Sequence, residues 1–324
     1  MILSVSRRTD IPNYYFEWFV NRLKEGFVYV RNPMNVHQIS KIDLSPQLVD
    51  CIVFWTKNPL PMLDKINDLQ SYSYYFQFTL TGYGKDIEPN LPDKRKILID
   101  VFRNLSLKIG REKMIWRYDP IIFTEQYTDA YHIKAFRTIA NSLSGYTDKV
   151  VISFVDLYTK TKRNMQGVNM IHMGKHRLEE FALKLSYIAG ENNMKIATCA
   201  EGIDLSACGM EHNCCIDQQL IEKIIGCKIK AQKDKNQRSE CGCIESVEIG
   251  SYNTCGNGCR YCYANDSDNK VQHNCKQYDP KSPILCSDIS DQDIITERKL
   301  KSLKVKQISI FDTVYEKPYG KSFL

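Results

Sequence analysis

The sequence predicts an α/β protein whose parallel strands alternate with helices and form a TIM-like (β/α) barrel, partial or complete. Three observations predict this fold. Six short apolar segments have the length and composition of buried strands. Amphipathic helical patterns lie between them and give units of about 35–40 residues. Most of the strand segments end in polar or charged residues, as expected where strands end at an active rim.

The expected strands are rich in Ile, Val, Phe, Tyr and Trp, which favour extended backbone. They cover residues 2–6, 51–56, 74–81, 113–118, 150–156 and 195–199. Hydrophobic periodicity and stop signals such as Gly26 and Gly226 predict the helices. These run from Pro12 to Gly26 and over about 93–108, 129–143, 175–189 and 216–225.

The chain is expected to have two parts. Residues 1–228 form the barrel core, with a β-hairpin inserted at about 27–44. Residues 229–324 form a cysteine-rich segment that completes the barrel, followed by a polar tail. In this second part we expect a strand over 246–252 and a helix near 291–303.

The composition is that of a globular protein that does not enter membranes. Of 324 residues, 43% are hydrophobic and 25% are charged, which is ample apolar content for a core. No apolar run reaches the roughly 18 residues that a membrane span needs. The N-terminal segment lacks a secretory apolar stretch, so a cytoplasmic location is expected. The net charge of +6 permits an anionic partner such as nucleic acid but does not require one.

Cysteine usage is the strongest chemical signal. Twelve of the 13 cysteines lie between Cys199 and Cys286, which indicates metal ligation in a reducing compartment. Cys255, Cys259 and Cys262 follow a CxxxCxxC spacing on a glycine-rich loop. Three such thiolates can bind three irons of a [4Fe–4S] cluster and leave the fourth iron open to a small molecule. A structural zinc site is the alternative, although zinc prefers paired CxxC units.

These residues resemble the radical SAM superfamily, whose signature is CxxxCxxC with an aromatic residue, here Tyr261, before the last cysteine. The resemblance implies a [4Fe–4S] cluster whose open iron binds S-adenosylmethionine. One-electron reduction of this complex gives a 5′-deoxyadenosyl radical that abstracts hydrogen from a substrate. The resemblance also implies a reductant such as flavodoxin or ferredoxin as a partner.

The whole chain also resembles the DUF1848 family over about residues 1–265. The segments that carry this resemblance are SVSRRTDIP, FWTKNP, RYDPI, CAE, CID, KDKNQRSECGC and IGSYNTCGNGCRYCYAN. FWTKNP and RYDP are also similar to the spore photoproduct lyase branch. The cluster loop of radical SAM proteins follows the first strand, whereas here it follows residue 250. We therefore expect a circular permutation in which the C-terminal segment packs beside the N-terminal strand.

A second, auxiliary cluster is expected on four of the other cysteines. Cys199, Cys215, Cys241 and Cys243 are the best candidates because they lie inside the family-like segments. Free buried cysteines and a zinc ion are the alternatives at this second site. Cys51 is expected in the core.

The polar residues at the strand ends supply the other candidate site residues. Lys57 and Arg117 are cations for the carboxylate of S-adenosylmethionine, and Asp119, Asp156 and Glu201 are acceptors for its ribose and ammonium groups. Glu201 is also placed with Arg7, Arg8 and Asp10 as a catalytic or substrate-holding residue. A rim salt bridge of little energetic value is the alternative for each. The histidines lack metal spacing and are expected at the surface.

The sequence therefore predicts a radical SAM enzyme with an unknown substrate and leaves two other functions open. One is a spore photoproduct lyase-like DNA repair enzyme. The other is a non-enzymatic zinc or iron–sulfur module that binds nucleic acid or protein. Tyr14, Tyr15, Tyr72, Tyr74 and Tyr75 would suit a nucleic-acid face, but ordinary packing of aromatic side chains is the favoured interpretation.

Overall fold

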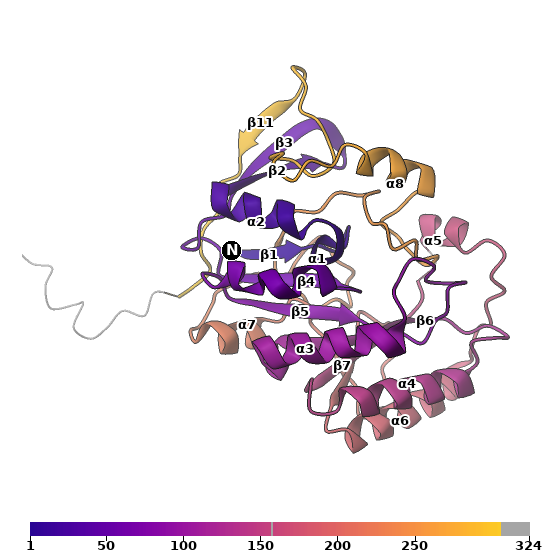
Figure 1. Ribbon diagram of the computed structural model, residues 1–324. Coiled ribbons are helices and arrows are strands. Elements are labelled where there is room, and N and C mark those ends of the chain that lie inside the picture. Colours follow the sequence, from indigo (N-terminus) through magenta and orange to yellow (C-terminus); the bar gives the residue numbers. More distant parts are fainter. Residues whose placement is uncertain (157, 306–324) are drawn as a thin grey trace, which may run out of the picture.

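The computed structural model describes residues 1–156 and 158–305, and its main feature is an eight-stranded parallel sheet (Figure 1). The strand order is β10-β1-β4-β5-β6-β7-β8-β9. The strands are β1 (Ile2–Val5), β4 (Cys51–Thr56), β5 (Tyr74–Thr79), β6 (Met114–Ile121), β7 (Lys149–Phe154), β8 (Lys195–Thr198), β9 (Glu211–His212) and β10 (Val247–Glu248). The six strands predicted from the sequence are confirmed, with ends that differ by three residues or fewer.

Helices connect these strands. They are α1 (Ile11–Tyr14), α2 (Phe16–Glu25), α3 (Ile99–Ile109), α4 (Asp129–Leu143), α5 (Thr159–Asn164), α6 (Lys175–Glu191), α7 (Gln218–Ile225) and α8 (Asp268–Cys275). A 3₁₀ segment over Leu60–Leu69 follows β4, and a π-turn over Lys94–Leu98 leads into α3. The five predicted helices are confirmed, the first of them divided at Tyr15 into α1 and α2, whereas α5, α8 and the 3₁₀ segment were not predicted from the sequence.

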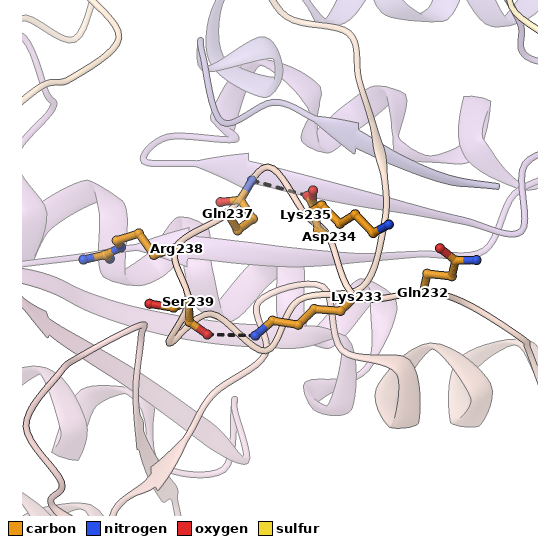
Figure 2. A pocket seen from close by; sticks show the side chains of 7 residues that line it. All are labelled: Gln232, Lys233, Asp234, Lys235, Gln237, Arg238 and Ser239. Atoms are coloured by element: carbon orange, nitrogen blue, oxygen red, sulfur yellow. Dashed lines mark hydrogen bonds between the residues drawn. The ribbon is translucent and has the colours of Figure 1, made fainter.

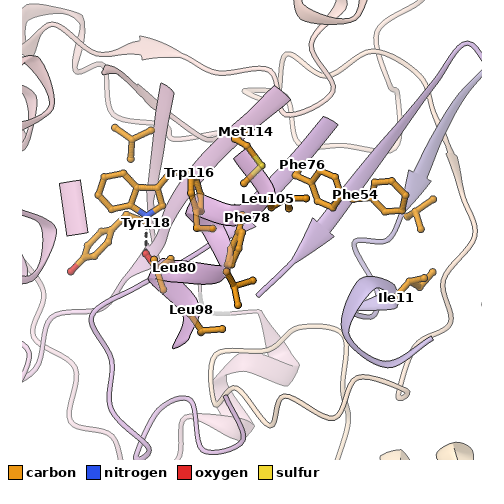
Figure 3. Close-up of a cluster of buried hydrophobic side chains, with 14 of the residues drawn as sticks. Ile11, Phe54, Phe76, Phe78, Leu80, Leu98, Leu105, Met114, Trp116 and Tyr118 are labelled. Atoms are coloured by element: carbon orange, nitrogen blue, oxygen red, sulfur yellow. Dashed lines mark hydrogen bonds between the residues drawn. The ribbon is translucent and has the colours of Figure 1, made fainter. Parts of the chain in front are cut away.

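One face of the sheet, which we call the outer face, packs against α2, α3, α4 and α6 and forms the larger core (Figure 3). α4 shows how the sequence builds this layer. The Thr128 hydroxyl caps the helix by accepting a hydrogen bond from the Tyr131 amide at 3.1 Å. Its buried stripe includes Phe136, whose ring stacks on Trp116 of β6 at a centroid distance of 4.8 Å. The Trp116 indole donates to the Leu80 carbonyl oxygen at 2.9 Å, so its polar atom is satisfied.

The inner face of the sheet changes character along the strands. Near the start of the strands, Ile2, Val53 and Val151 form a second apolar cluster with Ile221 of α7. Further along, the same face carries polar or amphipathic residues, which are Ser4, Trp55, Gln77 and Arg117. Side chains point to alternate faces along a strand, so every second residue lies on the inner face. In each of these strands the earlier of those residues is apolar and the later one is polar or amphipathic.

The C-terminal part of the chain packs beside the N-terminal strand, as predicted. β10 pairs with β1 in parallel, with Leu3 opposite Val247 and Ser4 opposite Glu248. The amino group of Met1 also donates to the Lys301 carbonyl oxygen at 3.0 Å. Residues from both predicted parts therefore share one sheet.

A smaller three-stranded sheet lies apart from the main one (Figure 1). The predicted hairpin is confirmed as β2 (Phe27–Asn32) and β3 (Asn35–Asp43), which are antiparallel. The predicted helix near 291–303 is wrong, because β11 (Ile294–Glu297) pairs with β3 there. The apolar pair Ile294–Ile295 suits a strand, and pairing with β3 outweighs the weak helical pattern of this segment.

One histidine also departs from expectation. The sequence places all six at the surface, but His132 is fully buried in α4. Its Nδ1 lies 2.8 Å from the Tyr118 hydroxyl and its Nε2 lies 2.9 Å from the Ile122 carbonyl oxygen. Burial lowers the pKa of His132 to about 4, so the ring is a neutral hydrogen-bonding bridge in the core. None of the helices described is both long and apolar enough to cross a membrane.

Candidate functional site

The predicted site residues meet at the carboxyl ends of the strands, in two groups of cysteines. We call Cys255, Cys259 and Cys262 the cysteine triad, and Cys199, Cys215, Cys241 and Cys243 the cysteine quartet. The triad lies on one loop after β10. The quartet is assembled from the end of β8, the segment after β9 and the connector before β10, which is residues 229–245. This arrangement places both groups where α/β proteins carry their chemistry.

Amide side chains hold the triad loop in place. Asn257 accepts from Asn13 Nδ2 at 3.1 Å and from the Tyr14 hydroxyl at 3.0 Å, and donates to Asp10 at 3.1 Å. Asn90 donates to the Gly256 carbonyl oxygen at 2.8 Å. Side chains from α1 and from the segments that follow β1 and β5 therefore hold the loop, since β10 itself contributes only two residues of strand.

The two loop glycines are required by close neighbours. Gly258 has a φ of +67°, which L-residues rarely adopt, and a Cβ there would lie 2.9 Å from the Asn90 amide nitrogen. A Cβ at Gly256 would lie 3.0 Å from the Tyr14 ring. The loop backbone is consequently packed closely against Tyr14 and Asn90.

Burial keeps the triad thiols protonated while no metal binds them. It raises the pKa of Cys255 well above its ordinary value and that of Cys259 to about 12. The three thiols are close enough to raise one another's pKa further. Lys57 acts in the opposite direction on Cys259 and Cys262. Binding of a cationic metal centre would therefore release protons here.

Beside the triad, Lys57 belongs to a buried ion network centred on Glu88. Lys57 Nζ lies 2.9 Å from Glu88 Oε1 and 2.6 Å from the hydroxyl of Tyr261, which itself donates to Glu88. Lys94 pairs with the other carboxylate oxygen. Burial would raise the pKa of Glu88, but the two ammonium groups lower it to about 2. The network fixes Lys57 and Tyr261 next to Cys259.

Asp10 has four donors on its two oxygens. They are the backbone amides of Asn13 and Lys57, the Thr56 hydroxyl and the Asn257 amide group, at 2.7–3.1 Å. Burial nevertheless raises its pKa above the ordinary value. With its acceptor capacity filled by the chain, Asp10 links β1, β4 and the triad loop.

The quartet thiols form a continuous chain of contacts. Cys199 Sγ lies 3.2 Å from Cys215 Sγ, and Cys215, Cys243 and Cys241 lie near enough to shift one another's pKa. The contact with Cys215, together with burial, raises the pKa of Cys199 well above its ordinary value. At the other end of the chain, the hydrogen bond with Cys243 lowers the pKa of Cys241 to about 7.

Arg117 reaches the quartet from β6. Its Nη1 donates to Cys215 Sγ at 2.8 Å and to Gln77 Oε1 at 3.2 Å, while Nε donates to Asp119 at 3.0 Å. Tyr75 and Gln77 of β5 donate to the Cys215 carbonyl oxygen at 2.7 and 2.8 Å. Strands β5 and β6 thus contact a residue that follows β9, across the inner face of the sheet.

The remaining predicted residues lie around these groups. Arg8 lies over the ring of Tyr252, with Cζ 4.8 Å from the ring centroid, and Asp156 pairs with Arg238 of the connector. Glu201 accepts a hydrogen bond from the Phe154 amide at 2.8 Å, and burial raises its pKa to about 7. None of these three contacts a cysteine of the triad through a hydrogen bond in the described part of the chain.

The connector forms a polar hollow at this end of the molecule (Figure 2). It is lined by Gln232, Lys233, Asp234, Lys235, Gln237, Arg238 and Ser239. Two hydrogen bonds hold its shape, from Lys233 Nζ to the Ser239 carbonyl oxygen at 2.7 Å and from Gln237 Nε2 to Asp234 at 3.3 Å. The lining holds three cationic side chains and one carboxylate, and the net charge stays positive when Asp156, which pairs with Arg238, is included.

Glu88, Lys94, Asn257 and Arg238 were not found from the sequence. Glu88 lies in a loop with no motif, and only its burial next to two lysines marks it. Asn257 lies inside the CxxxCxxC motif, so its presence was visible but its contacts were not. The expectation of ordinary packing for the five tyrosines is confirmed, since Tyr15 and Tyr75 are buried and the other three pack partly buried against the core. Cys51 is also in the core, fully buried in β4.

The thiols of each group lie close to one another. Within residues 1–156 and 158–305, no three or more His, Cys, Asp or Glu side chains are arranged to hold a single metal ion.

Sequence comparison places the chain in a family. No curated protein matches it. The model of a domain of unknown function, DUF1848, matches residues 2–264, which include the eight-stranded sheet, the triad and the quartet. The chain therefore belongs to the DUF1848 family.

Proposed function

We propose that this protein is a radical SAM enzyme with an open-iron [4Fe–4S] cluster at the triad and an auxiliary cluster at the quartet. The observation that carries the proposal is a loop with three clustered thiols and a tightly packed glycine backbone, beside a buried lysine. Three thiols fit a cluster that keeps one iron for another ligand. Cys275, the next cysteine along the chain, is directed to Tyr15 and to the Thr254 carbonyl oxygen.

When bound, the cluster and S-adenosylmethionine would supply a 5′-deoxyadenosyl radical. The residues of the chain have supporting roles. Lys57 offers a cation next to Cys259 for the carboxylate of S-adenosylmethionine, and Glu88 and Tyr261 hold the Lys57 ammonium in place. Asp10 positions the loop through Asn257. Arg117 and Asp119 serve the quartet rather than the triad, because Arg117 contacts Cys215.

A partial barrel with a permuted chain is the finer fold that we propose. The contacts of Tyr75, Gln77 and Arg117 with Cys215 support it, because they join the middle of the sheet to its β9 edge across the inner face. The quartet supports it too, since Cys215 follows β9 and Cys243 precedes β10, and these are the two edge strands. A flat sheet would keep its two edges far apart.

The test is anaerobic reconstitution of the full chain with iron and sulfide, followed by dithionite and S-adenosylmethionine. Formation of 5′-deoxyadenosine is expected in the wild type and in Cys51→Ala, whose cysteine lies in the core. It should be lost in Cys262→Ala. Zinc in the purified protein, with no 5′-deoxyadenosine after reconstitution, would instead indicate a non-enzymatic metal module.

A nucleic-acid substrate is a second candidate, favoured by exposed aromatic rings near the triad. Tyr158 and Tyr263 are 47% and 46% exposed, and their ring centroids lie 6.3 Å apart. Arg8 and Lys160 both lie over the ring of Tyr252. Stacking and cationic groups of this kind bind single strands. Affinity for single-stranded DNA that falls steeply with salt, and that Tyr263→Ala weakens, would support this candidate.

A further inference from the structure

Two arginines lie against the same tryptophan on the inner face, and only one of them is satisfied. The Cζ atoms of Arg7 and Arg117 lie 5.0 and 5.4 Å from the centroid of the Trp55 ring. Arg117 donates to Asp119, Gln77 and Cys215. The guanidinium of Arg7 makes no hydrogen bond within the part of the chain that the structure describes, and its ion pair with Asp234 is long at 3.9 Å.

Other groups of the chain do not fill this gap. The side chain of Arg7 is only 17% exposed, so water satisfies few of its five N–H groups. The neighbouring carboxylate of Glu248 is occupied by the Arg7 backbone amide at 2.9 Å, the Ser4 hydroxyl at 3.0 Å and the Gly250 amide at 2.9 Å. A largely buried guanidinium without acceptors is costly, which marks a position that an anion would occupy.

The location of Arg7 suits a substrate group. Cys215 of the quartet accepts from Arg117, which lies against the same Trp55 ring as Arg7. Tyr263, which directly follows Cys262, donates from its hydroxyl to the Arg7 carbonyl oxygen at 2.8 Å. Asp234, the weak partner of Arg7, also lines the positively charged hollow of residues 232–239. An anion drawn into that hollow would thus come next to Arg7.

We propose that the substrate carries a carboxylate or phosphate group, which Arg7 binds against the face of Trp55 after entry through this hollow. The inference rests on the proposed function for its statement that the ligand is the substrate. A guanidinium fork suits both groups because it can bind two of their oxygens at once. Carboxylate and phosphate substrates are distinguished by testing one probe that carries each group.

The experiment is calorimetric titration of the reconstituted full chain with inorganic phosphate and with benzoate. Wild type should bind at least one of them, and Arg7→Gln should weaken that binding tenfold or more. Arg111→Gln is the matched control, because it removes the same charge from a 60%-exposed side chain near the start of β6 and should leave binding unchanged. Preference for phosphate or for benzoate identifies the class of anion.

Failure to bind either anion, or equal binding by wild type and Arg7→Gln, would overturn the proposal and leave Arg7 as a counterion for the quartet thiolates. Iron content is measured in every sample, because Arg7 also lies beside the quartet. If Arg7→Gln loses iron, Arg7→Lys is the deciding variant. It keeps the charge but not the fork, so severalfold weaker binding is expected and wild-type binding would contradict the proposal.

The proposed function and the anion site fail in different ways. Arg7-dependent binding in a protein that makes no 5′-deoxyadenosine would refute the radical chemistry and retain the anion site. Formation of 5′-deoxyadenosine together with binding that is independent of Arg7 would support the radical chemistry and refute the anion site.

Discussion

The triad and the quartet are both groups of buried thiols, but the chain builds them in opposite ways. The triad comes from eight consecutive residues, and asparagine side chains fasten its loop to the sheet. The quartet comes from three separate segments, and its sulfur atoms contact one another and Arg117. A contiguous loop can present an open site without the rest of the fold, whereas an assembled site exists only when distant strands are in register. Changes at the quartet therefore test the assembly of the fold, and changes at the triad test the proposed chemistry.

The largest expected effect separates the two groups directly. Cys259→Ala removes one triad thiol and should reduce 5′-deoxyadenosine formation to background, because three thiolates are needed to hold the cluster. Iron in the reconstituted protein should fall from about eight to about four per chain, since the quartet is untouched. Iron analysis and chromatography of the nucleoside check both results. Retention of the wild-type iron content would contradict the assignment of the triad.

Arg117→Gln tests whether the quartet depends on the fold. It leaves Asp119 and Cys215 without their buried partner and should lower the free energy of unfolding by about 3–5 kcal/mol. Urea unfolding of the metal-free protein measures this. Arg137→Gln, on the exposed surface of α4, is the control and should change stability by less than about 0.5 kcal/mol. Equal losses of stability in the two variants would show that the contacts of Arg117 around the quartet contribute little to the stability of the fold.

Glu88 tests the ion network on the triad side through pH. Its folded pKa of about 2 lies below its unfolded value, so its contribution to stability is present at pH above about 4.3. That contribution, about 3 kcal/mol for such a shift, should be lost as the pH falls towards 2. Glu88→Gln should unfold more easily at pH 7 and show a flatter pH profile below pH 5. Parallel profiles for the two proteins would rule out this role.

Asn257 should have the smallest effect of the four. Asn257→Ala removes the amide that joins Asp10 to Asn13 and Tyr14, at an expected cost of about 1–3 kcal/mol for buried hydrogen bonds. Asn90→Ala removes one exposed hydrogen bond from the same loop and should cost less than about 1 kcal/mol. Thermal unfolding measures the stability of both variants. A larger loss of stability in Asn90→Ala than in Asn257→Ala would mean that Asp10 does not position the loop.

Sequence patterns were enough for much of the fold because the strands and helices have strong periodicity. α4 and β4 were placed to the residue, since their apolar patterns are clear and their ends are marked. β11 was mistaken for a helix because its partner, β3, lies more than 250 residues away along the chain. The residues next to β11 in the sequence do not indicate that it pairs with β3.

The candidate site was predictable where it is a motif and not where it is an assembly. The CxxxCxxC spacing reveals the triad without any structure. The four cysteines of the quartet were chosen from family-like segments, and the structure brings them together. The role of Glu88, and the difference between Arg7 and Arg117, depend on burial and on which donors are satisfied. Those properties arise only from the packing of the whole chain.

The position of Asn257 has a consequence for deamidation of the protein during storage. Asn257 precedes Gly258, a pairing in which the side-chain amide is readily lost through a cyclic imide, and the product is a carboxylic acid. That acid would face Asp10, whose oxygen now accepts from the amide group, so attraction would become repulsion. Both polar atoms of the Asn257 side chain are held, which should slow ring closure in the folded state. Stored protein should therefore lose this amide faster once it unfolds, as mass spectrometry of the peptide around residue 257 would show.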